Sequence, residues 1–158
     1  MRSVRLLQLL FALVVSVSLT GCGSKPPPPT IVELTVQATP TINPDDTGRP
    51  SPVIVRIYQL AGAGAFEKAD FFQLYEKEGA VLGTDLLGRD QVALAPGDSK
   101  SLTFEMKPTA KLIGIVAAFR DIGQATWRTE ATVPPNKTTK LTIVVDKLAV
   151  QVAAGAGS

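Results

Sequence analysis

Hydrophobic and polar residues alternate along much of the chain beyond residue 30. Every second residue from Val32 to Ala38 is apolar, and the residues between them are polar, as in a half-buried β-strand. The segment Val53–Leu60 is rich in β-branched residues and almost continuously apolar. We therefore predict a second strand that is buried on both faces, in which Arg56 and Tyr58 need polar partners.

Further strand patterns follow at intervals of 10–15 residues, with turn residues such as Pro96-Gly97-Asp98 between them. The expected strands cover residues 91–95, 102–106, 111–120, 124–133 and 140–147. Short strands separated by turns predict a mainly β protein built as an antiparallel β-sandwich.

Two segments between the first strands depart from this pattern. Residues 39–52 contain several prolines and a glycine, so we predict an irregular loop there. Over residues 67–77, Phe71, Leu74 and Tyr75 recur at helical spacing, which predicts a short helix inside a helical insertion near 66–78. Its apolar stripe is expected to pack on the sheet as a lid.

The N-terminus has the pattern of an export signal. Arg2 and Arg5 precede an apolar run over residues 6–19, which is shorter than the roughly 20 residues that span a membrane. We interpret residues 1–21 as a signal peptide. The ending Leu19-Thr20-Gly21-Cys22 resembles the lipobox of bacterial lipoproteins. That resemblance implies a diacylglycerol on the thiol of Cys22 and a further acyl chain on its amine.

A short tether separates Cys22 from the predicted domain. Residues 22–30 include four consecutive prolines, which favour an extended polyproline II conformation with a rise of about 3.1 Å per residue. Gly23 follows the cysteine, and by resemblance to enteric lipoproteins this favours sorting to the outer membrane. We assign residues 31–148 to the β-sandwich and residues 149–158 to a flexible tail.

Composition excludes several function classes. The 158 residues include no histidine and a single cysteine, so the commonest general base and any cysteine-based zinc site are missing. Without Arg2 and Arg5 the chain has 14 basic and 14 acidic residues, with no basic cluster in the sequence that indicates nucleic acid. We expect a binding or scaffolding protein with no catalytic residues, no metal and no cofactor beyond the lipid.

Several motifs resemble the TssJ family (SciN, VasD), the outer-membrane lipoproteins of the type VI secretion system. The most specific is Gly-Arg-Pro-Ser-Pro followed by Val-Ile-Val-Arg-Ile-Tyr-Gln-Leu over residues 48–60; weaker matches cover residues 43–45, 69–75, 94–97 and 117–122. The resemblance implies a transthyretin-like sandwich of two four-stranded sheets. Because the sequence shows only seven strands, an eighth is expected near residues 84–88.

The resemblance also implies a function. Members of this family are held at the outer membrane, face the periplasm and bind the periplasmic C-terminal region of TssM, an inner-membrane protein that partners TssL. In the family, the loop between the first two strands carries much of the contact. The corresponding residues here are Asn43, Pro44, Asp45, Asp46, Gly48, Arg49 and Pro50.

Other interpretations of these residues stay open. Asp45 and Asp46 also fit a solvated turn, and Asn43 fits an Asx turn. Arg56, Arg120 and Asp121 match family positions but fit salt bridges at the rim of the core equally well. For the whole protein, the alternative is a general envelope lipoprotein that binds the cell wall or another ligand.

Overall fold

The computed structural model describes residues 25–153. The predicted signal peptide and Cys22 lie outside the described residues. The strands are β1 (Ile31–Ala38), β2 (Val53–Leu60), β3 (Leu86–Leu94), β4 (Ser99–Glu105), β5 (Leu112–Ala117), β6 (Arg128–Thr132), β7 (Thr138–Asp146) and β8 (Ala149–Val152). Between β2 and β3 lie α2 (Gly64–Lys68), α3 (Phe71–Glu76), α4 (Glu78–Leu82) and the 3₁₀ turn η2 (Gly83–Asp85).

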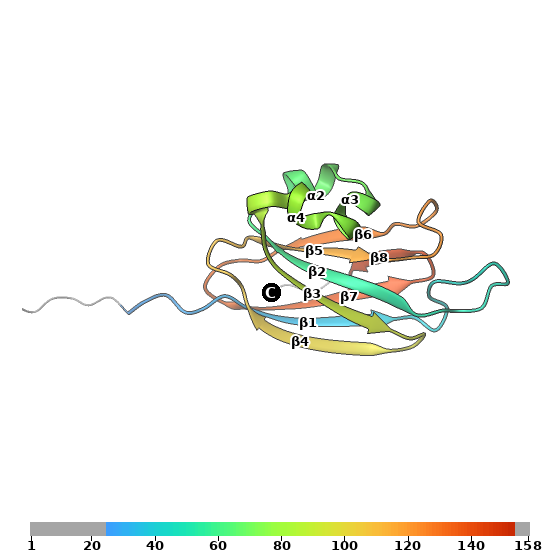
Figure 1. The fold of residues 1–158 in the computed structure, drawn as a ribbon. Coiled ribbons are helices and arrows are strands. Elements are labelled where there is room, and N and C mark those ends of the chain that lie inside the picture. Colours follow the sequence, from blue (N-terminus) through green and yellow to red (C-terminus); the bar gives the residue numbers. More distant parts are fainter. Residues whose placement is uncertain (1–24, 154–158) are drawn as a thin grey trace, which may run out of the picture.

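The strands form two four-stranded sheets that pack face to face, in the orders β4-β1-β7-β8 and β3-β2-β5-β6 (Figure 1). This confirms the predicted β-sandwich. All pairings between neighbouring strands are antiparallel except that of β1 with β7, which is parallel over all eight residues of β1. β1 and β7 therefore start at the same end of the molecule.

The main core lies between the sheets. Val32, Leu34 and Val36 of β1 are at most 1% exposed, whereas Glu33 and Gln37 face solvent, as the alternation predicts. From β2, Val55 and Ile57 enter this core, and Ile143 enters it from β7. Full burial of one such side chain stabilises the fold by about 1.5–3 kcal/mol.

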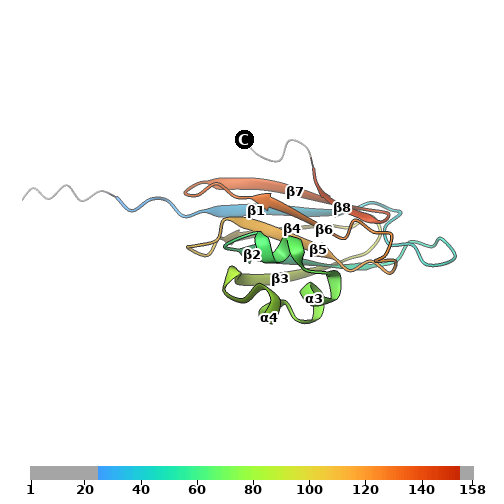
Figure 2. The same cartoon turned by 90° about the horizontal axis from the view of Figure 1, so that it is seen from above.

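A second apolar cluster covers the outer face of β2 and β5. Tyr58 and Leu60 of β2 pack there against Phe66 of α2 and Leu74 of α3, beneath the helices that Figure 1 shows above this sheet. Figure 2 shows the same helices lying along one face of the sandwich. The predicted lid is confirmed, and it explains why β2 and β5 are apolar on both faces.

Arg56 and Tyr58 of β2 find partners in the helices. The Tyr58 hydroxyl donates to the Leu74 carbonyl at 2.9 Å. The Arg56 guanidinium donates to the Tyr75 carbonyl, lies 3.8 Å from the Tyr75 ring centroid and is 3.6 Å from the Glu78 carboxylate. Partial burial alone would raise the pKa of Glu78, but its backbone hydrogen bond and the neighbouring guanidinium groups lower it.

The helical insertion is longer and more broken than the sequence predicts. A single helix over 67–77 is wrong, because Asp70 interrupts it with an extended ψ of 172° and begins a new helix. The Asp70 carboxylate accepts from the Gln73 N–H, and the Gln73 side chain accepts from the Asp70 N–H. This reciprocal capping box gives partners to two backbone N–H groups, which in a continuous helix would donate to carbonyls four residues earlier.

The C-terminal prediction also needs correction. Residues 149–152 are not a flexible tail but the strand β8, in which Val150 is 1% exposed and pairs with Val145. The eighth strand is therefore β8, whereas residues 86–88 belong to the long strand β3. A four-residue hairpin strand is too short to show a clear period, and its position depends on pairing with β7 and on backbone bonds to Thr126.

The contact between α2 and β5 depends on the absence of a side chain at Gly114. A Cβ there would lie 2.9 Å from both Leu60 Cδ1 and the Phe66 ring. We expect Gly114→Ala to lower the free energy of unfolding by about 1–3 kcal/mol, since both neighbours are buried and must move. Urea unfolding followed by tryptophan fluorescence measures this.

The matched control is Gly79→Ala in α4, where a Cβ meets no atom within 4 Å. We expect that substitution to be neutral or to stabilise the protein by up to about 1 kcal/mol. Equal effects at both positions would contradict the packing argument.

Candidate functional site

The loop between β1 and β2, residues 39–52, projects from one end of the sandwich. In both views it extends beyond the sheets at the end opposite the described part of the tether (Figures 1 and 2). We call this the loop end; it also includes residues 95–98, 118–127 and 147–148. At its root, the loop's backbone is hydrogen-bonded to residues 95–98 and 147–148. The Gly97 N–H donates to the Thr39 carbonyl, and the Asn43 N–H donates to the Lys147 carbonyl.

Two buried residues fix this root. Ile42 is fully buried in the main core. Asn43 is 2% exposed: its side-chain amide donates to the Pro52 carbonyl at 2.7 Å and accepts from the Arg120 N–H at 2.7 Å. Asn43 has a positive φ of 46°, a conformation that asparagine tolerates better than most residues. It thus joins both ends of the loop to the neighbouring 118–127 segment.

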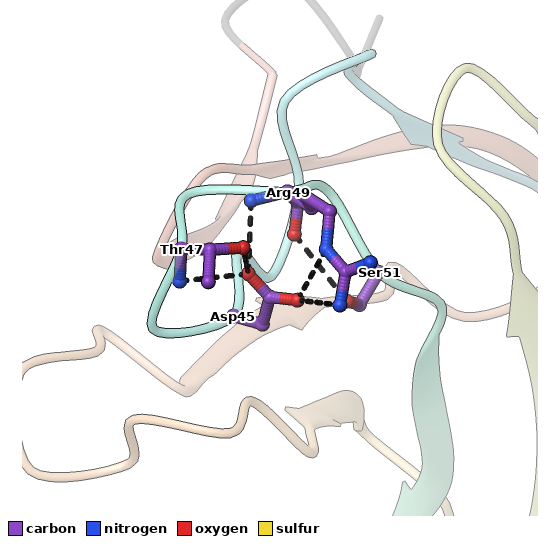
Figure 3. A network of polar contacts seen from close by, with 4 residues as sticks. All are labelled: Asp45, Thr47, Arg49 and Ser51. Carbon is purple, nitrogen blue, oxygen red and sulfur yellow. Dashed lines mark hydrogen bonds and ion pairs between the residues drawn. The ribbon is translucent and has the colours of Figure 1, made fainter.

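The tip of the loop is closed by Asp45 (Figure 3). Its carboxylate accepts from the N–H and hydroxyl of Thr47, at 2.9 and 2.7 Å, and from the N–H of Arg49 at 3.0 Å. The Arg49 guanidinium adds a charge-assisted contact at 2.8–2.9 Å. The backbone closes the same ring, because Asp45 N–H donates to the Arg49 carbonyl, and Gly48, at φ 80°, donates to that of Asp45.

These contacts keep Asp45 ionised. The Thr47 hydroxyl and the Arg49 backbone N–H are the main causes that lower its pKa from 3.8 to about 2. The stabilisation they provide is therefore present above pH 3.8 and is lost as pH falls through about 2. At neutral pH the tip is a closed, charged turn.

The structure divides the seven predicted contact residues into three groups. Asn43 lies inside the protein, so it positions the loop and presents no surface to a partner. Pro44 and Asp45 are half-buried, whereas Asp46, Gly48, Arg49 and Pro50 are exposed. That the six accessible residues contact a partner remains a prediction.

A hollow of about 380 Å³ lies beside the loop. It is lined by Pro44, Asp45 and Asp46 from the loop, and by Arg120, Asp121 and Leu148 from neighbouring segments. Arg120 and Asp121 are exposed, so they are not rim salt-bridge residues of the core. The sequence motif over 117–122 singled them out, but only the fold brings them to the loop; Leu148 carried no sequence signal.

Among residues 25–153, no group of three or more histidine, cysteine, aspartate or glutamate side chains is placed to hold a metal ion. Within the same range, no helix has the length and hydrophobicity needed to cross a membrane.

The family model of type VI secretion lipoproteins, described by the names VasD, EvfM and TssJ, matches residues 30–148. The chain belongs to this family. The crystal structure of the type VI secretion lipoprotein TssJ1 from Pseudomonas aeruginosa is similar, with 34% identity and a TM-score of 0.77 over 80% of this chain and 96% of that chain.

Other solved type VI secretion structures are also similar. Lip from Serratia marcescens, a membrane-bound component of the type VI secretion system, is 27% identical, with a TM-score of 0.73 over 79% of this chain and 96% of Lip. A chain of a type VI membrane complex is 28% identical, with a TM-score of 0.69 over 78% and 98% of the two chains. The comparison with curated proteins gave no significant match. The type VI lipoproteins are secretion components and not a class of enzymes.

Asn43 provides a test of how this type VI lipoprotein holds its loop. Asn43→Ala leaves the Arg120 N–H and the Pro52 carbonyl without partners and places alanine at positive φ. We expect the free energy of unfolding to fall by about 2–4 kcal/mol, measured by urea denaturation. Asp46→Ala at the exposed tip is the control, with an expected change within about 0.5 kcal/mol. Unchanged stability of Asn43→Ala would contradict the positioning role.

Proposed function

We propose that this type VI lipoprotein is anchored to the outer membrane by lipids on Cys22 and binds the periplasmic C-terminal region of TssM. Through TssM and its partner TssL, it would tie the inner-membrane part of the secretion complex to the outer membrane. The observation that carries the proposal is a further structural match. A chain of a solved structure of the TssM C-terminal domain (869–1107) from EAEC is 27% identical, with a TM-score of 0.66.

The lengths of the matched chains support this interpretation. The match covers 78% of this 158-residue chain and 98% of the other chain. A chain so nearly covered is much shorter than a domain that spans 869–1107. The match is therefore consistent with a lipoprotein-sized chain in a structure determined for TssM.

The shape of the loop supports it as the contact surface. Its root is held by Ile42 and Asn43, and its tip by Asp45, so docking would order few additional degrees of freedom. The exposed charges of Asp46 and Arg49, with those of Arg120 and Asp121 beside the hollow, would set the register and rate of association more than its strength.

The arrangement of the two ends also fits a bridge. β1 begins where the tether ends and finishes where the loop begins; at about 3.3 Å per residue its eight residues span about 26 Å. A protein held at the tether would therefore present the loop away from the membrane. This arrangement supports a contact on the side that would face a partner crossing the periplasm.

Multiple acyl chains would make the anchor stable. Each buried methylene contributes about 0.8 kcal/mol, and one chain alone gives only marginal binding. The alternative, a general envelope lipoprotein that binds the cell wall, accounts for the anchor but not for the match to a TssM structure.

We predict that Asp46→Ala with Arg49→Ala raises the Kd for the TssM periplasmic region about 10-fold, mainly through slower association, because both side chains are exposed charges at the tip. Isothermal titration calorimetry with the purified TssM region measures the change in Kd. The matched control, Lys68→Ala with Glu76→Ala, removes one base and one acid from the helices, and we expect it to leave Kd unchanged. Equal affinity for wild type and the loop variant would exclude the tip as the contact.

For the anchor, we predict that Cys22→Ser moves the protein from the outer-membrane fraction to the soluble periplasm or leaves it unprocessed in the inner membrane. The reason is that serine lacks the thiol that accepts diacylglycerol. Membrane fractionation and mass spectrometry of the N-terminal peptide test this. An unchanged outer-membrane fraction for Cys22→Ser would rule out lipid anchoring at this residue.

A further inference from the structure

The end of the sandwich where the tether enters differs in charge from the loop end. We define this tether end as residues 25–30, 106–111 and 133–137. It contains Lys25, Lys107, Lys111 and Lys137, all exposed, and no acidic residue. The loop end, by contrast, contains four acidic and three basic residues.

Hydrogen bonds fix the tether between the two lysine-bearing loops. The Thr30 carbonyl accepts from the Met106 N–H at 2.8 Å, and the Thr30 hydroxyl accepts from the Asn136 N–H at 2.8 Å. Ile31 N–H donates to the Lys137 carbonyl at 3.1 Å. The lysines therefore surround the point where the chain leaves the domain towards Cys22, which lies only eight residues before Thr30.

Apolar residues lie between these lysines. A hollow of about 430 Å³ is lined mainly by apolar side chains, among them Pro108, Ala110, Val133 and Pro135, with Lys111 at its edge. Three carboxylates border the tether end: Glu33 is 3.7 Å from the Lys140 ammonium, Glu105 ends β4, and Asp85 lies beside Gly62, next to the Ala61 that also lines the hollow. The tether end thus combines exposed cations with a small apolar surface.

We propose that the tether end is a second membrane-binding surface, at which the lysines contact anionic phospholipid headgroups next to the acylated cysteine. This rests on the proposed lipid anchor, which brings the tether end to the membrane. Lysines close to an anionic membrane each favour binding about 5-fold, and the effect decays within about 8 Å at physiological salt. The contact would hold the domain upright on its tether with the loop pointing away from the membrane.

Net charge does not explain such binding. The chain that follows the predicted signal peptide has equal numbers of acidic and basic residues, so a neutral protein is attracted to an anionic surface only through a local cluster. The lysines of the tether end are separated in sequence and gathered by the ends of β1, β4 and β6.

The test uses the lipid-free mature chain, residues 22–158 with Cys22→Ser, which contains every described strand and helix and both apolar clusters. Cosedimentation with phosphatidylethanolamine–phosphatidylglycerol vesicles is compared with phosphatidylcholine vesicles. We expect binding only to the anionic vesicles, weakening as salt rises. Replacement of Lys107, Lys111 and Lys137 by glutamine should lower the partition coefficient roughly 100-fold.

The matched control replaces Lys68, Lys77 and Lys100, which are exposed and lie outside the tether end, by glutamine. We expect it to bind like wild type. Equal losses in both triple variants, or equal wild-type binding to neutral vesicles, would overturn the proposal. The salt titration of the wild type is a test that no folding defect in a variant can disturb.

A parallel TssM binding measurement separates this inference from the proposed function, because the vesicle assay contains neither acyl chains nor TssM. Normal TssM binding with no vesicle binding would overturn only the membrane surface. Loss of TssM binding in the tether-end variant, with vesicle binding unchanged, would also overturn it and assign the lysines to a protein contact.

Discussion

The structure depends on the way β1 is held. This strand is paired along nearly its whole length, with β4 on one side and β7 on the other, and its inward side chains are almost completely buried. It continues into the tether at one end and into the projecting loop at the other. Any force between a lipid anchor and a partner at the loop would therefore act along β1, as shear on two rows of backbone hydrogen bonds.

The second sheet supports this arrangement by being covered on both faces. β2 and β5 carry buried apolar residues on both faces because the main core lies on one side and the helices on the other. Arg128 links β6 to these helices: its guanidinium donates to the carbonyls of Phe66 and Ala69 at 2.9 and 2.7 Å, at the end of α2. The helices are thereby tied to the sheet without a long continuous helix.

The long, strongly periodic strands could be predicted from the sequence, because their alternation records which face is buried. Features that depend on partners far away in the sequence could not be predicted in this way. Asp70 interrupts a helix whose apolar spacing looks continuous, β8 needs β7 to become a strand, and Asn43 resembles a surface turn residue until Arg120 and Pro52 are brought beside it. The lysines of the tether end belong to the same class, since they lie on segments that only the topology brings together.

The loop could be located from the sequence, because its prolines and glycine exclude regular structure and its flanking motif is specific. The hydrogen bonds inside the loop could not be predicted from the sequence, since the closure of the tip depends on the carboxylate of Asp45 accepting from Thr47 and Arg49. That closure distinguishes the loop from a mobile linker, and it is the physical basis for our proposal that the loop end contacts a partner.

The most direct test of this account is amide hydrogen exchange of the protein with and without the TssM periplasmic region. Exchange slows where binding covers or stabilises backbone amides. We predict slower exchange over residues 44–51 and 118–124, with no change over residues 106–111 and 133–137. Protection confined to the tether end or to the helices, with the loop unchanged, would contradict it.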